Sequence, residues 1–392
     1  MHDLSVALVT HEYPPYHIGG VGSYCEDLAR FLVRKQIKVT VFCGRSTKIH
    51  TEKVNDYLEI VRLPFPDVAL RAYWFQLRNL SFLRKALRNF DVVHVVNPQA
   101  AAVSSFTGDR TIPLVTTLHA VPRFAAKAFF NAPQESWTLR ELASIFIETP
   151  INEIFTRTCL KNSYKTVLVS RNLLMQAKVA FRGISEDKAV VIPNGVDFQR
   201  IEKAEQSIDQ AKRTDVLFYG RLVWAKGVTY LIDALAQLKR DFPSIRAKLI
   251  GTGPLFDRLK RVVDNRDMIH NVQFLGYLPR EEVLREIFRS SVIALPSIYE
   301  AGSVAVLEAM ACGRPVVAFD YAFTREFVKD LYSGLLAKPN DSSDLATKIR
   351  LLLQDEKRRT ELGRNGSRLA HSAYNWEILA EKYVRVYREL EP

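Results

Sequence analysis

Short apolar runs rich in β-branched residues recur along the first half of the chain, and longer segments of mixed polarity separate them. The runs have the length of buried strands, and the separating segments have the length of helices; 23–35 is one of these. Strands that alternate with helices are typical of βαβ units, which build a parallel sheet. The predicted strands are 4–10, 37–43, 91–96, 113–118 and 165–170.

The same pattern restarts in the second half. After "AVVIPNGVD" (189–197), a polar stretch at 198–215 is interpreted as a linker or an exposed connection. The last part, 341–390, has a helical pattern throughout, and its final segment is expected to pack on a domain. The pattern therefore predicts two doubly wound α/β domains that meet at a cleft, with ligands outside the carboxyl ends of the strands. The second set of strands is 216–220, 247–251, 272–276, 291–296 and 315–319.

The length of the chain agrees with two domains. The chain has 392 residues, and each half is long enough to bury its own core. The net charge is +12; residues 1–196 hold 24 basic and 16 acidic side chains, and residues 197–392 hold 31 and 27. A basic surface suits phosphates, anionic lipid or nucleic acid, although solubility alone is the simpler explanation of the charge taken by itself.

The cysteines and the apolar runs predict a cytoplasmic protein. Four scattered cysteines form no CxxC and no Cys/His cluster with metal-ligand spacing, which is typical of reduced core thiols. The first residues lack the basic region of a signal peptide, and their apolar run is short. No run of eighteen apolar residues predicts a membrane span.

Two acids stand in an otherwise apolar segment, "PSIYEAGSVAVLEAMACGRPVV" (296–317). Glu300 is expected in the loop after a strand, and Glu308 in the second turn of the following helix. The backbone amides of 302–305 begin that helix, and a helix N-terminus favours an anion such as phosphate. The two acids can then contact the two ends of one elongated ligand. For either acid alone, a solvated position on an exposed helix is the simpler interpretation.

Two cations follow an earlier strand, in "YGRLVWAKG" (219–227). Arg221 and Lys226 both suit a diphosphate, Arg through its fork and Lys as a point charge. Ionised carboxylates only accept hydrogen bonds, so Glu300 and Glu308 suit hydroxyl groups. A ligand with hydroxyls at both ends and a diphosphate between them is a nucleotide sugar.

Together these segments resemble the family 4 glycosyltransferases of the GT-B fold. The matching pieces are "THEYPPYHIGGVGSYCEDLARFL", "VTTLHA", "VVIPNGVD", "FYGRLVWAKGVTYLIDAL", "LIGTGPL", "VQFLGYLP", "LPSIYEAGSVAVLEAMACGRPVVA" and "GLLAKPND". The resemblance implies retaining transfer of a hexose from a UDP- or GDP-linked donor to a hydroxyl acceptor, such as a lipid-linked or cell-envelope glycan, with no metal and no cofactor. It implies an acceptor-binding domain at 1–192 plus a returning helix at 373–392, and a donor-binding domain at 193–372.

The resemblance also implies roles for the site residues. Glu308 would hold the ribose hydroxyls, and Glu300 would contact the transferred sugar beside the amides of Gly302, Ser303 and Val304. Arg221 and Lys226 would neutralise the diphosphate as the glycosidic bond breaks, because fixed cations there lower the barrier. The nucleobase would be held by backbone near Gly276, Tyr277 and Leu278.

The N-terminal half is expected to bind the acceptor. Gly19 and Gly20 follow the first strand, where small residues allow close backbone approach. Neither "GVGSYC" nor "GTGPLF" completes a dinucleotide fingerprint, which argues against a nicotinamide enzyme. His119 follows the strand 113–118 and matches the family's histidine; we expect it near the sugar, although a lone histidine is more often structural.

One segment departs from the family pattern. Family members usually show Gly-Gly a few residues before a glutamate after "PVVA", and here Ala322 and Phe323 stand where the glycines are expected, ahead of Glu326. The identity of the donor, and even full activity, therefore stays open.

The stretch 68–90 is basic and contains no acid, and its apolar residues run at helical spacing. Such a helix can lie on an anionic membrane surface, or it can pack on the sheet with a solvated basic face; the pattern leaves both open. With "VPRFAAKAFF" (121–130), it suggests a lipid-linked or membrane-bound acceptor and a peripheral position at the inner face of a membrane.

Two alternatives have different functions. A relative of the same fold that only binds or epimerises a nucleotide sugar would share the donor site. A nucleic-acid-binding protein would need clustered cations with aromatic residues able to stack on bases, and the second half does not show them. No nucleic-acid partner is therefore expected.

Overall fold

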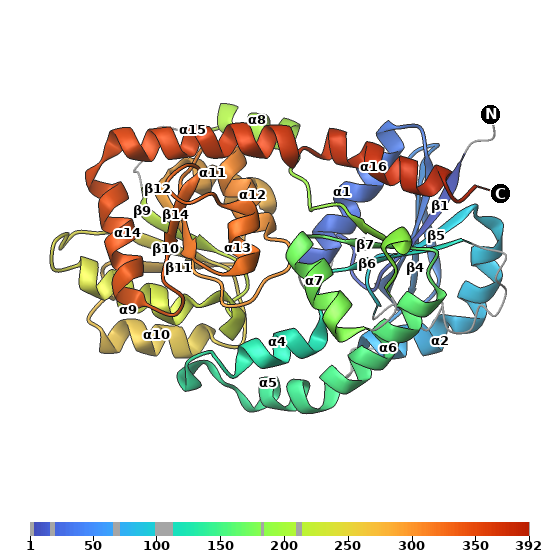
Figure 1. The fold of residues 1–392 in the computed structure, drawn as a ribbon, viewed down its shortest axis with the longest axis horizontal. Coiled ribbons are helices and arrows are strands. Elements are labelled where there is room, and N and C mark those ends of the chain that lie inside the picture. The colour runs from blue at the N-terminus through green and yellow to red at the C-terminus, as the bar shows by residue number, and fades with distance from the viewer. Residues whose placement is uncertain are drawn as a thin grey trace. The chain divides into compact units, whose positions relative to one another are not determined.

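The computed structural model describes residues 4–15, 20–65, 71–98, 113–181, 184–208 and 214–391. It contains two compact units, each with its own parallel sheet and helices (Figure 1). The prediction of two α/β domains is confirmed. The first unit comprises Met1–Phe124, Ala143–Asn194 and Trp376–Pro392, and the second comprises Ala125–Leu142 and Gly195–Asn375.

The first unit has an eight-stranded sheet in the order β3-β4-β2-β1-β5-β6-β7-β8. Its pairs are parallel apart from β3 with β4. These two strands were not predicted. β3 is a wholly exposed edge strand, so its sequence has no alternation of apolar and polar residues that would indicate a strand. The bounds are β1 Ser5–Val9, β2 Lys38–Ser46, β3 His50–Lys53, β4 Leu58–Pro64, β5 Val92–Val95, β6 Leu114–Leu118, β7 Lys165–Leu168 and β8 Ala189–Val191.

The C-terminal helix α16 (Trp376–Arg388) completes the core of the first unit. It lies beside α1 (Gly20–Arg34), and both cover one face of the sheet (Figure 1). The Tyr383 hydroxyl lies 2.6 Å from that of Tyr24, and the Tyr387 hydroxyl lies 2.6 Å from Nδ1 of His94. Other helices of this unit are α2 Arg71–Ala86, α6 Thr149–Asn162 and α7 Arg171–Ala180.

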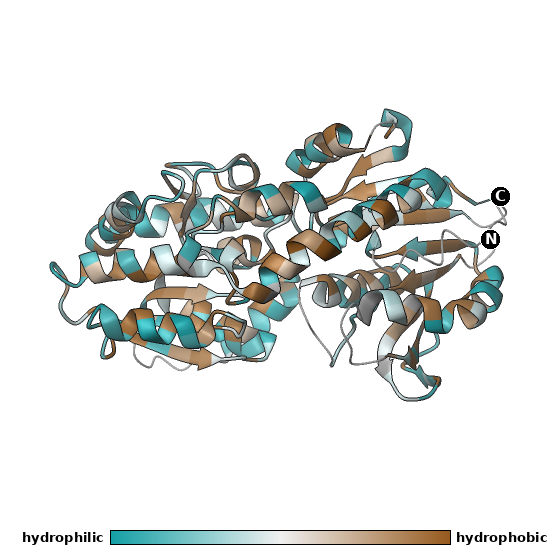
Figure 2. Ribbon diagram, turned by 90° about the horizontal axis from the view of Figure 1, so that it is seen from below, coloured by the Kyte–Doolittle hydropathy of each residue, from teal (hydrophilic) through white to brown (hydrophobic). Residues whose placement is uncertain are grey.

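The second unit has a six-stranded sheet in the order β11-β10-β9-β12-β13-β14, parallel throughout. Its strands are largely apolar (Figure 2), which is typical of a sheet covered by helices on both faces. The strands are β9 Thr214–Tyr219, β10 Ala247–Ile250, β11 Val272–Gly276, β12 Ser290–Leu295, β13 Val316–Phe319 and β14 Gly334–Ala337. The helices are α8 Phe198–Gln206, α9 Val228–Leu238, α10 Phe256–Asn265, α11 Arg280–Phe288, α12 Val304–Ala311, α13 Ala322–Phe327, α14 Ser342–Gln354 and α15 Glu356–Ala373.

The interpretation of 198–215 as a linker is wrong for its first part, which forms α8. Asp197 caps this helix by accepting hydrogen bonds from the amides of Gln199 and Arg200. Ile201 and Ala204 are buried on its inner face. Two apolar residues in a polar stretch are a weak signal, and the cap supplies the stability that composition alone did not indicate.

The segment Ala125–Leu142 lies between β6 and β7 in the sequence and belongs to the second unit. It includes the end of α4 (Pro122–Phe129) and most of α5 (Leu139–Ala143). Aromatic packing explains this grouping: the Phe129 ring is stacked on Trp137 at 5.1 Å and meets Trp224 edge to face at 5.2 Å. The predicted assignment of acceptor and donor to the two domains stays a prediction.

Candidate functional site

The two strand exits that carry the predicted donor site are neighbours in the second sheet. β9 pairs with β12 in parallel, so Arg221 and Glu300 follow adjacent carboxyl ends. Strand order reverses at β9, because β10 and β11 lie on one side of it and β12 to β14 on the other. Ligands of doubly wound sheets bind at such a point.

Lys226 and Glu300 meet directly. Nζ of Lys226 donates to Oε1 of Glu300 at 2.7 Å, and the two side chains are 22% and 15% exposed. Backbone bonds hold the loops together, since the amides of Ile298 and Tyr299 both donate to the carbonyl of Ala225. The sequence predicted these two residues at one site, but not that they form an ion pair.

Gly227 is required for this contact between the loops. Its backbone adopts φ +61°, and a Cβ there would lie 2.0 Å from the carbonyl oxygen of Pro296. No side chain fits that space, and the left-handed conformation is itself unfavourable for other residues. Gly227 therefore fixes the position of Lys226 against the loop that carries Glu300.

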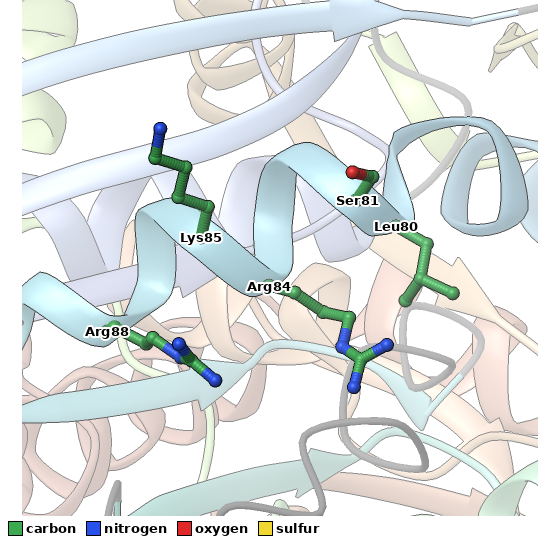
Figure 3. A pocket seen from close by; sticks show the side chains of 5 residues that line it. All are labelled: Leu80, Ser81, Arg84, Lys85 and Arg88. Atoms are coloured by element: carbon green, nitrogen blue, oxygen red, sulfur yellow. The ribbon is translucent and has the colours of Figure 1, made fainter.

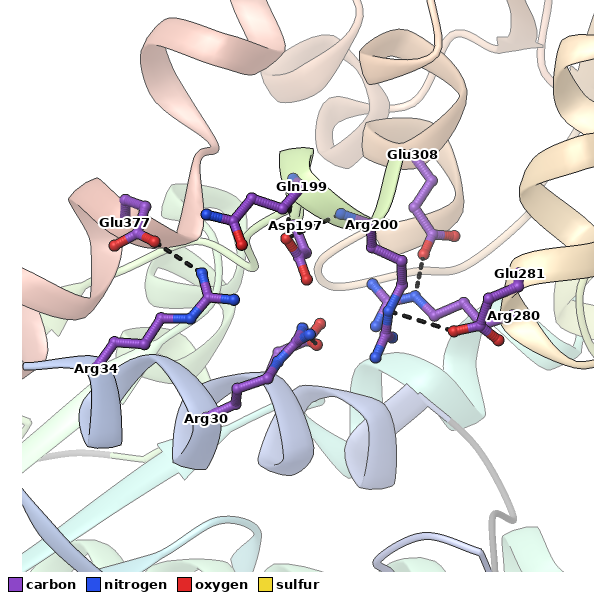
Figure 4. Close-up of polar contacts among 10 residues, drawn as sticks. Arg30, Arg34, Asp197, Gln199, Arg200, Arg280, Glu281, Glu308 and Glu377 are labelled. Carbon is purple, nitrogen blue, oxygen red and sulfur yellow. Dashed lines mark hydrogen bonds and ion pairs between the residues drawn. The ribbon is translucent and has the colours of Figure 1, made fainter. Parts of the chain in front are cut away.

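Glu308 lies in α12 and is buried. Its Oε1 accepts from Nε of Arg280 at 2.7 Å, and the two side chains are 8% and 17% exposed (Figure 4). Arg280 begins α11, where Arg200 also pairs with Glu281. Sequence reasoning missed Arg280, whose only signal is its place two residues after the predicted base-binding segment.

The start of α12 offers a polar group to a ligand. Ser303 is the N-cap residue and is buried, and its Oγ has no hydrogen-bond partner among the described residues. A buried hydroxyl normally has a hydrogen-bond partner, so the Oγ of Ser303 is a candidate to bind a ligand. Gly302 and Val304 flank it, and the amide of Val304 donates to the carbonyl of Gly302.

Glu141 is a second residue that the sequence did not indicate. It lies in the segment packed on the second unit, where its carboxylate accepts from Oγ1 of Thr138 at 2.9 Å and from the backbone amide of Trp224. Burial raises the pKa of this carboxyl, and the hydrogen bonds from Thr138 and Trp224, followed by the positive charge of Arg221, partly offset the rise. Arg221 is itself exposed. Glu141 thus helps to hold the loop of the two predicted diphosphate cations.

The predicted base-binding residues follow β11 at the same edge of the sheet. Gly276 adopts φ +68°, Tyr277 is 66% exposed, and Leu278 is half-buried against the core. The carbonyl of Gly276 accepts from the amide of Gly251, which ties this exit to that of β10. An exposed tyrosine ring beside a backbone turn is a suitable platform for a base.

His119 follows β6 in the first unit. Burial lowers its pKa to about 4, so the imidazole is neutral at pH 7. It forms a hydrogen bond with the backbone of Val96, its ring meets Tyr24 edge to face, and Nε2 is buried with no partner among the described residues. Gly20 is the first residue of α1, and Gly19 lies outside the described residues.

Phe323 is buried at the start of α13 and stacks on Tyr321 at a centroid distance of 5.4 Å. The departure at Ala322 and Phe323 therefore places a packed aromatic side chain where the family has glycine. Among the described residues, no group of three or more acidic, His or Cys side chains could hold a metal ion, and no helix is long and apolar enough to cross a membrane.

Two family profiles together match most of the chain. Residues 18–200 match "Glycosyltransferase Family 4", and residues 199–369 match "Glycosyl transferases group 1". Three relatives are similar over most of their length. An uncharacterized glycosyltransferase of Methanocaldococcus jannaschii, MJ1607, is 25% identical and covers 98% of both chains. Glycogen synthase of Mycobacterium tuberculosis is 26% identical and covers 98% of this chain and 94% of the relative.

The third relative is N,N'-diacetylbacillosaminyl-diphospho-undecaprenol alpha-1,3-N-acetylgalactosaminyltransferase of Campylobacter jejuni, 26% identical over 86% of this chain and 88% of the relative. Among solved structures, sucrose-phosphate synthase from Thermosynechococcus elongatus has a TM-score of 0.79 at 20% identity, covering 99% of both chains. Anabaena Alr3699/HepE in complex with UDP-glucose has a TM-score of 0.75 at 19% identity, covering 98% of this chain and 100% of that one. With both profiles matched and the GT-B fold shared, the chain belongs to the GT4-type glycosyltransferases.

Proposed function

We propose that this glycosyltransferase moves a hexose from a UDP- or GDP-hexose to a hydroxyl acceptor with retention of the anomeric configuration and without a metal. The observation that carries the proposal is the pairing of Lys226 with Glu300 at 2.7 Å, at adjacent strand exits and one helix from Glu308. Retention rests on the resemblance of the Glu300–Glu308 segment to that of retaining enzymes. The M. jannaschii and C. jejuni relatives are both named as transferases of sugars.

The ion pair gives the donor site its chemistry. A donor diphosphate attracts Lys226 away from Glu300, which then accepts hydrogen bonds from hydroxyls of the hexose. The bond from the anomeric carbon to the phosphate oxygen breaks, and its electron pair leaves with the nucleoside diphosphate. The acceptor oxygen bonds to that carbon on the same face, and its proton passes to the leaving phosphate oxygen. Arg221 and Lys226 stabilise the charge that develops on the phosphate.

Glu308 and His119 have complementary binding roles in this proposal. Arg280 donates to Glu308 and holds its carboxylate in place, where it can accept hydrogen bonds from the two ribose hydroxyls. Neutral His119 has Nε2 free to form a hydrogen bond with a hydroxyl of the sugar or the acceptor. The bound UDP-glucose of Alr3699/HepE and the diphospho-undecaprenol acceptor named for the C. jejuni relative support a UDP donor and a lipid-linked acceptor.

The experiment measures nucleoside diphosphate release from a panel of UDP- and GDP-hexoses. Glu300→Gln should lower turnover at least about a hundredfold while nucleotide affinity stays within a few-fold, because the charge acts on the sugar. Glu202→Gln, at an exposed position of α8, is the matched control and should behave as the parent. Parent-like turnover of Glu300→Gln would contradict the role of Glu300, and an inverted product by NMR would contradict retention.

A second candidate is a relative that binds or epimerises the nucleotide sugar without transfer, and buried Phe323 in place of a glycine favours it. Transfer by the parent, in the presence of a lipid-linked or soluble acceptor, excludes this candidate. A parent that converts the donor sugar without an acceptor supports it.

We further propose that the first unit binds an anionic membrane surface, where a lipid-linked acceptor would be found. The side chains of Phe75 and Leu83 on α2, and of the adjoining Leu87, are buried in the core. One face of the helix therefore packs on the unit, as expected for a helix packed on the sheet. Its outer face still carries Trp74 and Leu77, each 51% exposed.

Cations lie further along the same helix and on the turn that follows it. Arg84, Lys85 and Arg88 line a hollow of about 350 Å³ on α2, shown with Leu80 and Ser81 in Figure 3. The ring of Tyr73 on α2 contacts Phe155 on α6, so α6 lies alongside. Three further apolar side chains are exposed there and on the preceding turn: Phe146 at 68%, Ile147 at 56% and Ile154 at 64%. Exposed apolar residues beside cations are typical of a surface that inserts among anionic headgroups.

Flotation on vesicles of phosphatidylglycerol and phosphatidylcholine in equal parts tests this surface. The parent should float at low salt and lose binding at high salt. Trp74→Ser with Leu77→Ser should weaken binding, whereas Met175→Ser with Val179→Ser, which are more exposed and lie on α7, should not. No flotation of the parent at low salt would contradict membrane binding.

A further inference from the structure

A small cavity of about 200 Å³ lies in the second unit at the amino ends of β12 and β13. Lys226 and Glu300 follow carboxyl ends of the same sheet, so this cavity is at the opposite edge. It is formed where α11 ends, where the loop after α12 turns into β13, and where α15 begins. The proposed transfer does not use any of its residues.

Three of the lining residues are arginines from three different elements. Arg289 follows α11, Arg314 lies in the loop before β13, and Arg359 lies in the second turn of α15. Ser291 and Thr360 also line the cavity, and the hydroxyl of Thr360 donates to the carbonyl of Glu356 at 2.9 Å. Glu356 is the acid among the residues that line it. Its side chain is 74% exposed, so water screens its charge.

Arg289 is held in place but not saturated. Its Nη1 lies 3.1 Å from Oε1 of Glu286. The other oxygen of Glu286 accepts from Nζ of Lys248 at 2.5 Å, so this acid is shared between two cations. Nε of Arg289 is buried and has no hydrogen-bond partner among the described residues. A buried donor without a partner is uncommon and indicates an absent acceptor, a ligand or an ordered water.

Arg359 is fixed by the helix that precedes its own. Its Nη1 donates to the carbonyl of Leu352 at 2.9 Å, at the end of α14. Its Nη2 lies 3.4 Å from the exposed Glu356. The guanidinium is therefore oriented before any ligand binds, which reduces the entropy lost on binding.

Two glycines fix the loop that presents Arg314. Gly313 adopts φ +66°, and a Cβ at Gly363 of α15 would lie 2.1 Å from the carbonyl oxygen of Gly313. The loop and the helix are thus packed backbone to backbone. The positions of Arg314 and Arg359 relative to each other are set by this close packing.

We propose that this cavity is a binding site for a phosphate group. Guanidinium groups and hydroxyls are hydrogen-bond donors that suit phosphate oxygens. The positive charge of the three arginines also exceeds the negative charge of Glu356, the single exposed acid. The volume is below the range typical of whole organic ligands, so it accepts one phosphate, either free or as the end of a phosphorylated sugar.

The helix α12 connects this cavity to the proposed donor site. This helix has eight residues and spans about 12 Å. It begins next to Ser303, carries Glu308, and ends at the turn that presents Arg314. We infer that phosphate bound at Arg314 changes donor affinity through this helix, and such coupling is reciprocal.

The test is calorimetric titration of inorganic phosphate and of a hexose 6-phosphate into a Lys226→Gln variant, in which phosphate binding at the donor site is weakened. We expect saturable binding that falls at least tenfold on adding Arg314→Gln and Arg359→Gln. Arg261→Gln, an exposed arginine of α10, is the matched control. Equal affinities indicate free phosphate as the ligand, and tighter binding of the hexose phosphate indicates a phosphorylated sugar.

Thr360→Glu provides a second variant in case the double substitution impairs folding. Thr360 is exposed, so the substitution leaves the core intact while it places a negative charge at the cavity. It should abolish binding of both probes. No binding to the parent site, or unchanged affinity in Thr360→Glu, overturns the proposal. An unchanged donor KM at saturating phosphate overturns the coupling alone.

Discussion

At the scale of single residues, the donor site is built from charges that neutralise each other before substrate arrives. Lys226 pairs with Glu300 and Arg280 with Glu308, in both cases largely out of water. Removing one member of such a pair is more harmful than removing both, because the survivor is left without compensation. This asymmetry makes the pairs accessible to experiment.

The pair of Arg280 with Glu308 gives a prediction about stability and binding together. Arg280→Leu leaves the buried Glu308 carboxylate unpaired, so the free energy of unfolding should fall by about 3 kcal/mol. The donor KM should rise as well, because the carboxylate of Glu308 is no longer held in place for the ribose hydroxyls. Urea unfolding and donor titration measure the two effects. Full stability of the single variant would show that Glu308 has another partner.

The buried histidines of the first unit predict a dependence of stability on pH. Burial lowers the pKa of His119 to about 4 and that of His94 to about 3. In the unfolded chain both bind protons near pH 6.5, so below that pH the unfolded state binds more protons and the free energy of unfolding falls on acidification.

Urea unfolding at pH 4.5 and pH 6.5 checks this sign. His119→Gln should flatten the dependence by up to about 1.4 kcal/mol per pH unit, the contribution of one proton. If the slope of the variant equals that of the parent, His119 is not buried in its neutral form in solution.

At the scale of elements, tight loops fix the site. Gly227→Ala places a methyl group against the Pro296 carbonyl at a left-handed position, so unfolding free energy should fall by more than about 1 kcal/mol. Turnover should also fall, because Lys226 and Glu300 are no longer held in contact with each other. Gly20→Ala, where a Cβ meets nothing within 4 Å, is the control for stability. An equal loss of unfolding free energy in both variants would contradict the close contact between Gly227 and the Pro296 carbonyl.

How far the sequence predicted these elements depends on where their partners lie. Buried strands such as β9 and β12 have apolar runs of their own, and the residues that follow them therefore point to one sheet edge. The segment with Phe129 and Glu141 has no such signal, because its partner Trp224 is nearly a hundred positions later. Arg280 was missed because an arginine before two acids is ordinary on a helix surface.

At the scale of the whole molecule, each unit has its own apolar core, and the proposed donor groups all belong to the second. A donor nucleotide should therefore stabilise the second unit by mass action, by about 2.7 kcal/mol at a hundredfold excess over Kd. Scanning calorimetry should resolve two unfolding transitions, and the nucleotide should raise the midpoint temperature of only one of them. A single transition that shifts as a whole would show that the units unfold together.

The return of α16 has a consequence for how the chain is made. The first strand of this sheet is Ser5–Val9, yet Trp376 and Tyr383 of its core are synthesised much later than that strand. At ordinary rates of translation the early strands wait on the order of tens of seconds with that apolar face uncovered. Chaperones can therefore bind the nascent N-terminal half, and a message cut short yields a product that remains a substrate for proteases.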